Sequence, residues 1–137
     1  MKTNISIALL FFIALTLGAC SSKMTFQDSS VVPAASGDVK VKKDKNNNYQ
    51  ITVNVANLAE PKKLTPSRNV YIVWMDSDRS ITKKLGQIKV GSGMFSKALT
   101  GEINVTEAEK PDRVFITAED NADTMSPSTE VVLTTGR

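Results

Sequence analysis

The chain of 137 residues contains no histidine and a single cysteine, Cys20. Without histidine it cannot build the histidine triads, histidine general bases and most zinc sites that many enzymes use. One cysteine cannot form a disulfide within the chain, and no second thiolate is present to share a metal. We therefore predict a protein that is not an enzyme and that carries no cofactor.

The chain also lacks a strong excess of charge of either sign. Its 17 lysine and arginine residues and 14 aspartate and glutamate residues give a formal net charge of +3. Domains that bind nucleic acid usually carry a strongly basic face, so this near balance argues against a nucleic acid partner. The length suits one domain with a hydrophobic core and is too short for two.

The longest apolar run stands near the beginning of the sequence. It covers residues 5–17, follows Lys2 and is succeeded by small residues. This is the layout of a signal peptide, and the run is shorter than the roughly 20 residues of a membrane-spanning helix. The sequence Leu17-Gly18-Ala19-Cys20 resembles the lipobox of bacterial lipoproteins. The resemblance implies that residues 1–19 are cleaved off and that Cys20 carries a diacylglycerol on its sulfur.

A lipid on Cys20 implies a domain outside the cytoplasm, anchored to a membrane of the bacterial cell envelope. Two or three acyl chains form a stable anchor, because each buried methylene contributes about 0.8 kcal/mol, whereas one chain holds only marginally. Acylation would also remove an unpaired thiol from an oxidising compartment. The alternatives are a plain signal peptide with a chance cysteine and an uncleaved anchor.

The segment 20–37 is rich in serine and alanine and shows no sustained period. We predict that it forms the lipidated N-terminus and a flexible tether, with a root-mean-square span of about 20–25 Å. A short first strand at Val31 and Val32 is the alternative. The folded domain is then predicted over 38–137.

From residue 38 onward, apolar residues recur with a period of two and turn-forming residues separate the runs. This pattern predicts strands over 39–43, 49–57, 70–76, 81–90, 96–99 or 102–105, 113–118 and 130–134. A kink or bulge is expected at Gly86. We predict an all-β fold, an immunoglobulin-like antiparallel β-sandwich of about seven strands. Trp74 stands on a strand that is apolar on both faces, so we predict it at the centre of the core, between the sheets.

The sequence from about residue 49 to residue 133 resembles the extracytoplasmic C-terminal domain of anti-sigma factors of the anti-sigma-K family. The shared pattern is an aromatic-x-x-Trp strand, a Leu-Gly pair, and a strand that ends in an acidic residue before a proline-containing loop. These positions are Tyr71, Trp74, Leu85, Gly86, Glu119 and Pro127. The chain departs from that family because it has no histidine for the zinc-binding segment and carries the lipobox-like sequence instead. The resemblance therefore implies a fold and not control of a sigma factor.

Acidic residues gather in two short stretches, Asp76-Ser77-Asp78 and Glu119 to Asp123. Such oxygen ligands suit Ca²⁺, and one interpretation is a site at one end of the sandwich, shared by Asp76, Asp78, Asp120 and Asp123. Both stretches lack the glycine and the distal glutamate of an EF-hand loop, and aspartate and asparagine are common turn residues. We therefore predict separate turns and no metal site.

Lysines cluster around the first predicted hairpin, at Lys40, Lys42, Lys43 and Lys45. The favoured interpretation is that they protect an edge strand against pairing with strands of other molecules. The alternative is attraction to anionic lipid headgroups beside the anchor.

Together these features predict a lipid-anchored extracytoplasmic binding or interaction module without catalytic activity, with a protein partner in the envelope. One alternative is a sensory or regulatory domain, for which the anti-sigma resemblance is the sole support. Another is a structural subunit of the cell envelope or of a surface assembly, which would accept a strand from a neighbour at an exposed sheet edge. The sequence assigns no oligomeric state.

Overall fold

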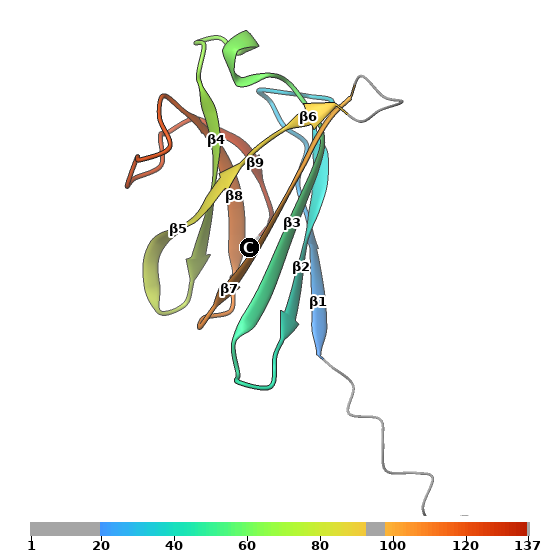
Figure 1. Cartoon of the computed structure of the whole chain (residues 1–137), viewed down its shortest axis with the longest axis vertical. Helices are drawn as coiled ribbons and strands as arrows, with labels where there is room; N and C mark the ends of the chain where they lie inside the picture. The colour runs from blue at the N-terminus through green and yellow to red at the C-terminus, as the bar shows by residue number, and fades with distance from the viewer. Residues whose placement is uncertain (1–19, 93–97, 137) are drawn as a thin grey trace, which may run out of the picture.

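The computed structural model describes residues 20–92 and 98–136, and the predicted signal peptide lies outside them. The described residues form two antiparallel sheets, with strand orders β1-β2-β3-β7-β6 and β5-β4-β8-β9 (Figure 1). The strands are β1 (Ser21–Thr25), β2 (Ser36–Lys43), β3 (Tyr49–Leu58), β4 (Val70–Ser77), β5 (Ser80–Ile88), β6 (Gly91–Ser92), β7 (Leu99–Glu107), β8 (Arg113–Glu119) and β9 (Val131–Thr134). A single 3₁₀ turn, η1 (Pro61–Lys63), lies between β3 and β4.

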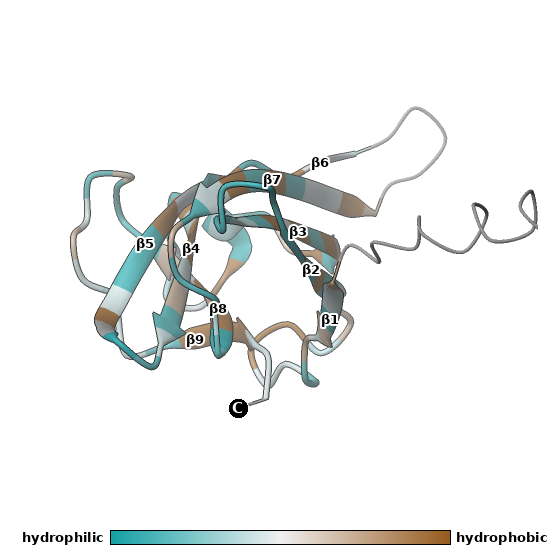
Figure 2. Ribbon diagram, turned by 90° about the horizontal axis from the view of Figure 1, so that it is seen from below, coloured by the Kyte–Doolittle hydropathy of each residue, from teal (hydrophilic) through white to brown (hydrophobic). Residues whose placement is uncertain are grey.

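The two sheets surround a common apolar core, which Figure 2 shows end-on. Alternate residues of the facing strands supply its centre: Val39, Val41, Ile51, Val53, Tyr71, Val73, Met75, Val114 and Ile116. The prediction of an all-β fold with antiparallel sheets is thereby confirmed. The predicted number of about seven strands is too low, because β1 lies where a tether was predicted and the short β6 lies between two predicted strands. The immunoglobulin-like topology stays a prediction.

The prediction of a flexible tether over 20–37 is wrong. β1 pairs along its whole length with β2, and the chain that follows buries Phe26, Val32 and Ala35 in the core. β1 escapes detection because it lies at the edge of its sheet and most of its side chains are exposed, so no apolar alternation marks it. The alternative strand at Val31 and Val32 is also wrong, since these residues lie in a turn region.

The predicted first hairpin is confirmed as β2 and β3. Val39 pairs with Val53 and Val41 with Ile51, so the apolar residues of both strands share the inner face. The turn between them places Asn47 in the left-handed region, with a φ of 63°. β2 lies between β1 and β3 and is not an edge strand. The favoured interpretation of its lysines as edge protection is therefore wrong.

The predicted irregularity at Gly86 is confirmed as a shift of register between β4 and β5. Val73 pairs with Gly86, whereas the next residue, Trp74, pairs with Lys84. Gly86 has a φ of 149°, and a Cβ there would lie 2.9 Å from Cδ1 of Ile103 on β7. Glycine is required at this position because residues with a side chain rarely adopt this φ, and β5 also lies close to Ile103 of the neighbouring sheet here.

Both open sides between the sheets are bridged by contacts. On one side the chain leaves β1 and crosses to the other sheet, where Phe26 forms an antiparallel bridge with Thr135. On the other side Lys83 of β5 forms an ion pair with Glu107 of β7. The sandwich therefore approaches a closed barrel, and the N-terminal strand is joined to both sheets.

Trp74 is fully buried, but it does not lie between the sheets, so that prediction is wrong. Successive residues of β4 divide between two clusters: Tyr71, Val73 and Met75 join the main core, and Ile72 and Trp74 join a second cluster. In this second cluster Trp74 packs with Phe115 on the outer face of the four-stranded sheet, against Ala122 of the segment after β8. The strand is apolar on both faces because a loop, not a second sheet, covers one of them.

Candidate functional site

Cys20 is exposed and its thiol is free. It directly precedes β1, and its carbonyl oxygen accepts a hydrogen bond from the N–H of Lys43 at 3.4 Å. Figure 1 shows the chain entering β1 at the same end of the sandwich as the β2–β3 turn, the β4–β5 turn and the β7–β8 loop. We call this the Cys20 end. The sulfur therefore lies at the surface of the folded domain, and no linker separates Cys20 from the first strand.

A shallow groove of about 160 Å³ opens beside Cys20. The residues that line it come from three parts of the chain: Cys20, Ser21, Ser22, Val41, Lys43, Tyr49 and Lys110. The Lys43 ammonium lies 5.8 Å from the centre of the Tyr49 ring, within the range of a cation–π contact. The groove thus combines an aromatic wall, two lysines and the thiol.

A second cavity of about 230 Å³ adjoins this groove and shares Tyr49 and Lys110 with it. Its remaining walls come from the β4–β5 turn and the β7–β8 loop: Ser77, Asp78, Arg79, Ala108, Glu109 and Asp112. Carboxylates therefore line this second cavity together with Arg79 and Lys110, whereas the groove beside the thiol is lined by lysines and by no carboxylate.

The two acidic stretches lie at opposite ends of the four-stranded sheet. On the β4–β8 pair, Asp76 is opposite Arg113 at one end and Val70 is opposite Glu119 at the other. Six residues of strand separate these ends, which corresponds to about 20 Å. A calcium site shared by Asp76, Asp78, Asp120 and Asp123 is therefore excluded. In the described part of the chain, no three His, Cys, Asp or Glu side chains converge as metal ligands would.

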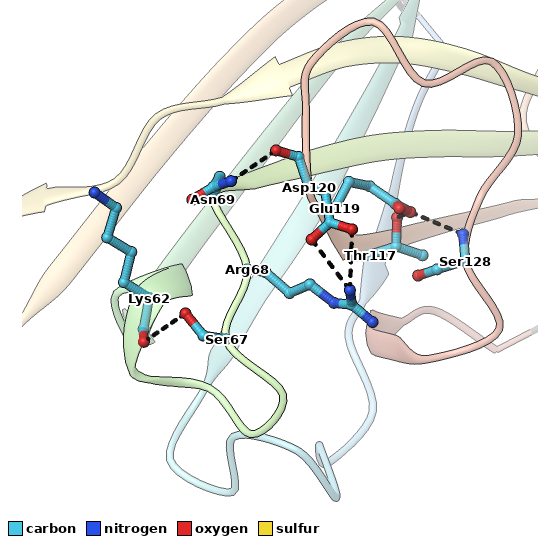
Figure 3. A network of polar contacts seen from close by, with 8 residues as sticks. All are labelled: Lys62, Ser67, Arg68, Asn69, Thr117, Glu119, Asp120 and Ser128. Carbon is cyan, nitrogen blue, oxygen red and sulfur yellow. Dashed lines mark hydrogen bonds and ion pairs between the residues drawn. The ribbon is translucent and has the colours of Figure 1, made fainter.

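Each acidic stretch is held by an arginine. An oxygen of Asp76 lies 2.7 Å from an Nη atom of Arg113, and its other oxygen accepts a hydrogen bond from the Thr82 hydroxyl. At the far end the Arg68 guanidinium donates to both oxygens of Asp120, at 3.1 and 3.3 Å (Figure 3). These carboxylates serve as structural acceptors that fix turns to neighbouring strands.

Glu119 is buried, with 7% of its surface exposed, and its carboxylate organises the segment 120–130. Oε1 accepts a hydrogen bond from the Thr117 hydroxyl at 2.5 Å and another from the N–H of Ser128 at 2.8 Å (Figure 3). Lys84 donates to the carbonyl oxygens of Ala122 and Thr124 in the same segment. These hydrogen bonds fix the segment over Trp74, so the network stabilises the fold.

Two groups have shifted pKa values. The hydrogen bond from Asn54, at 3.2 Å, and the ion pair with Lys23 lower the pKa of Asp38, against an opposing effect of burial. Burial raises the pKa of the Tyr71 hydroxyl to about 12, and this hydroxyl donates to the carbonyl oxygen of Ala59 at 2.8 Å. Neither group lines the two cavities at the Cys20 end, and both act on stability.

Comparison with known proteins returns nothing: no family model, curated protein or solved structure matches the chain. The resemblance to the anti-sigma domain stays a prediction. Within residues 20–92 and 98–136, no helix has the length and apolar character needed to cross a bilayer.

Sequence reasoning identified Cys20 and the lysines of the hairpin but missed Tyr49 and Lys110 as their neighbours. Tyr49 begins β3 and Lys110 lies in the β7–β8 loop, and the β3–β7 pair brings them together because Tyr49 is opposite Glu107. Nothing local in the sequence marks a pairing between strands so far apart. A correct prediction of the sheet order would have been needed first.

Proposed function

We propose that this chain is a lipid-anchored extracytoplasmic binding module of a bacterial cell envelope, without catalytic activity. The observation that carries the proposal is the position of Cys20. It follows a lipobox-like sequence and directly precedes the first strand, with its thiol exposed at one end of the sandwich. A cysteine kept for packing would be buried, because free cysteine is among the most buried residue types.

The anchor would orient the domain. A lipid on Cys20 holds the Cys20 end beside the bilayer, and β3, with ten residues, then reaches about 33 Å away from it. The loops at the far end include 59–69 and the beginning of the segment 120–130 (Figure 1). These loops are the part of the domain that a partner in the envelope meets first.

One exposed apolar side chain marks a partner surface on that segment. Met125 is 83% exposed although the segment around it is fixed by Glu119 and Lys84. An adaptable, polarizable side chain on a fixed loop suits contact with another protein. We therefore propose a protein partner that contacts the segment 120–130.

The anchor is tested with Cys20→Ser, and Ser21→Ala at the exposed neighbouring position serves as the matched control. Cys20→Ser should move the protein from the detergent fraction of membranes to the soluble fraction and should remove the mass of the acyl chains. Ser21→Ala should fractionate as the unchanged chain does. Unchanged fractionation and mass for Cys20→Ser would contradict the anchor.

The partner is tested with a photo-crosslinking amino acid at Met125, and the same amino acid at exposed Gln50 is the control. Gln50 lies on β3, in the other sheet. Irradiation of intact cells should give one discrete adduct from position 125 and none from position 50. Equal adducts from both positions, or none from either, would contradict a partner at the segment 120–130.

A further inference from the structure

The lysines of the first hairpin need an explanation other than edge protection, because β2 is an interior strand. Lys42 and Lys43 are its last residues, and Lys45 lies in the turn that follows. All three side chains are exposed. In the part of the chain that the structure describes, none of the three forms an ion pair with a carboxylate. No carboxylate of the described residues therefore neutralises these charges through an ion pair, and the Lys43 ammonium lies over the Tyr49 ring.

These lysines lie directly beside the proposed lipid anchor. In the β1–β2 pair Lys42 is opposite Ser21, and the N–H of Lys43 donates to the carbonyl oxygen of Cys20. Lys110 comes from the β7–β8 loop and lines the same groove as Cys20 and Lys43. We call Lys42, Lys43, Lys45 and Lys110 the anchor lysines.

Of the acidic groups nearby, one belongs to the hairpin turn and the others line the neighbouring cavity. Asp44 turns inward on its own loop, where Oδ1 accepts hydrogen bonds from the N–H groups of Asn46 and Asn48. Asp78, Glu109 and Asp112 line the neighbouring cavity and do not line the groove beside Cys20. The groove that adjoins the lipid attachment point is therefore lined by Lys43 and Lys110 and by no carboxylate.

We infer that the anchor lysines form a docking surface for the anionic headgroups of the membrane that holds Cys20. This inference rests on the proposed function, because the acyl chains bring the surface to the bilayer. No tether separates Cys20 from β1, so the acyl chains would hold this end of the domain close to the headgroups. Attraction between the lysines and anionic headgroups is screened over a Debye length, roughly 8 Å at physiological ionic strength, so this closeness is what makes it effective. A lipid chain and a basic patch are the two signals that together give stable, oriented membrane attachment.

A second feature of the same end agrees with contact to a bilayer. Ile81, at the beginning of β5, is 91% exposed, and the β4–β5 turn beside it carries Arg79. The same turn also carries Asp78, so the exposed Ile81 side chain, and not the charge of the turn, is what suits the boundary between headgroups and acyl chains. Docking through the anchor lysines would bring this turn toward that boundary.

The test uses the full-length protein after processing, with acylation verified by mass, in lipid vesicles. Because an acylated Cys20 cannot react with maleimide, a fluorophore can be placed on Asn46→Cys in the β2–β3 turn or, as control, on Met125→Cys. Vesicles consist of phosphatidylcholine alone or with one third phosphatidylglycerol, each with a headgroup spin label as quencher. In the anionic vesicles, quenching at position 46 should exceed quenching at position 125 at least threefold. In neutral vesicles, or in 0.5 M salt, this ratio should fall at least twofold.

Charge reversal supplies the matched pair of variants. Lys42→Glu with Lys45→Glu should lower quenching at position 46 in anionic vesicles at least twofold. Lys62→Glu with Lys89→Glu makes the same change in net charge at exposed positions of the far end, and should leave quenching unchanged. An equal effect of the two pairs would overturn the inference, because it would reflect net charge and not a surface.

The outcomes separate this inference from the proposed function. A processed protein without acyl chains on Cys20 overturns both. An acylated protein whose quenching at position 46 is the same on neutral and anionic vesicles overturns the docking surface alone. An acylated protein whose two labels are quenched equally in anionic vesicles overturns both the docking surface and the orientation proposed for the anchored domain, and leaves the anchor itself.

Discussion

The indole Nε1 of Trp74 donates a hydrogen bond to the Thr117 hydroxyl oxygen at 2.8 Å, and both side chains are fully buried. The same hydroxyl donates to Glu119, whose carboxylate also holds the N–H of Ser128. A single threonine hydroxyl therefore connects the only tryptophan of the chain to the segment 120–130 that covers it. The outer face of the four-stranded sheet depends on this connection.

Replacing that hydroxyl should destabilise the protein. Thr117→Val keeps the shape of the side chain but leaves the Trp74 N–H without an acceptor and the Glu119 carboxylate with one donor fewer. Buried polar groups left unsatisfied in this way cost about 1–3 kcal/mol of unfolding free energy, measured by urea titration. Thr117→Ser, which keeps the hydroxyl and loses one methyl, should lose about 1 kcal/mol. Equal stability of Thr117→Val and the unchanged chain would contradict the connection.

The position of Trp74 under a loop can be tested by loosening the loop. Lys84→Ala removes the donor to the carbonyl oxygens of Ala122 and Thr124, so the segment 120–130 should open more often. Acrylamide quenching of Trp74 fluorescence should then rise at least twofold. Lys83→Ala, at the preceding residue of β5, should leave the quenching of Trp74 unchanged. Lys83 forms an ion pair with Glu107 of β7, on the side of the sheet away from the segment 120–130. If neither variant changes the quenching, Trp74 is shielded by the sheets and not by the loop.

Tyr71 should make the protein less stable at high pH. Its pKa is about 12 in the folded protein and about 10 in the unfolded chain, so only the unfolded chain ionises between these values. Stability from this group is thus fully present below pH 10 and is lost as the pH rises toward 12, by about 3 kcal/mol. Tyr71→Phe lacks this loss. The unfolding free energy of the unchanged chain should therefore exceed that of Tyr71→Phe at pH 8 and fall below it by pH 12.

The comparison with Tyr71→Phe is needed because lysines titrate in the same range and act equally on both proteins. A difference between the two that stays constant from pH 8 to pH 12 would show that Tyr71 ionises at the same pH in the folded and unfolded chains.

Calcium should have no effect on melting. Asp76 forms an ion pair with Arg113, and Asp120 forms one with Arg68 at the opposite end of the β4–β8 pair. The two acidic stretches therefore cannot form one calcium site. A bound ion would stabilise the fold by RT ln(1 + [L]/Kd). Melting temperatures in EDTA and in millimolar calcium should coincide within error, for the unchanged chain and for Asp120→Asn. A rise of several degrees in calcium, lost in Asp120→Asn, would contradict this.

The sequence predicts those strands whose two faces meet different surroundings. Val39, Val41, Ile51 and Val53 alternate with polar residues, and β2 and β3 form where this alternation predicts them. Trp74 is the exception, because β4 is apolar on both faces and its sequence pattern does not distinguish the face that meets the other sheet. The segment 120–130 covers the Trp74 face of β4, so the opposite face meets the other sheet. The polar sequence of this segment does not indicate that its backbone is fixed over the tryptophan.

The N-terminal segment differs from its prediction for a related reason. The composition of β1 is typical of a linker, with Ser21, Ser22 and Lys23 as its first residues. It forms a strand because its backbone hydrogen-bonds to β2. Of the candidate site, the thiol and the hairpin lysines could be identified from the sequence. The inference that they lie side by side requires the β1–β2 register, which depends on partners distant in the chain.

The way β1 is attached also determines how the domain responds to force. A pull on Cys20, against a load held at the far end, acts along the axis of β1. The hydrogen bonds between β1 and β2 run perpendicular to that axis, so the force shears all of them together and does not open them one by one. Phe26, directly after β1, adds its bridge to Thr135, directly after β9, and its side chain is buried in the core. The first strand is therefore a mechanical clamp between whatever holds Cys20 and the rest of the sandwich.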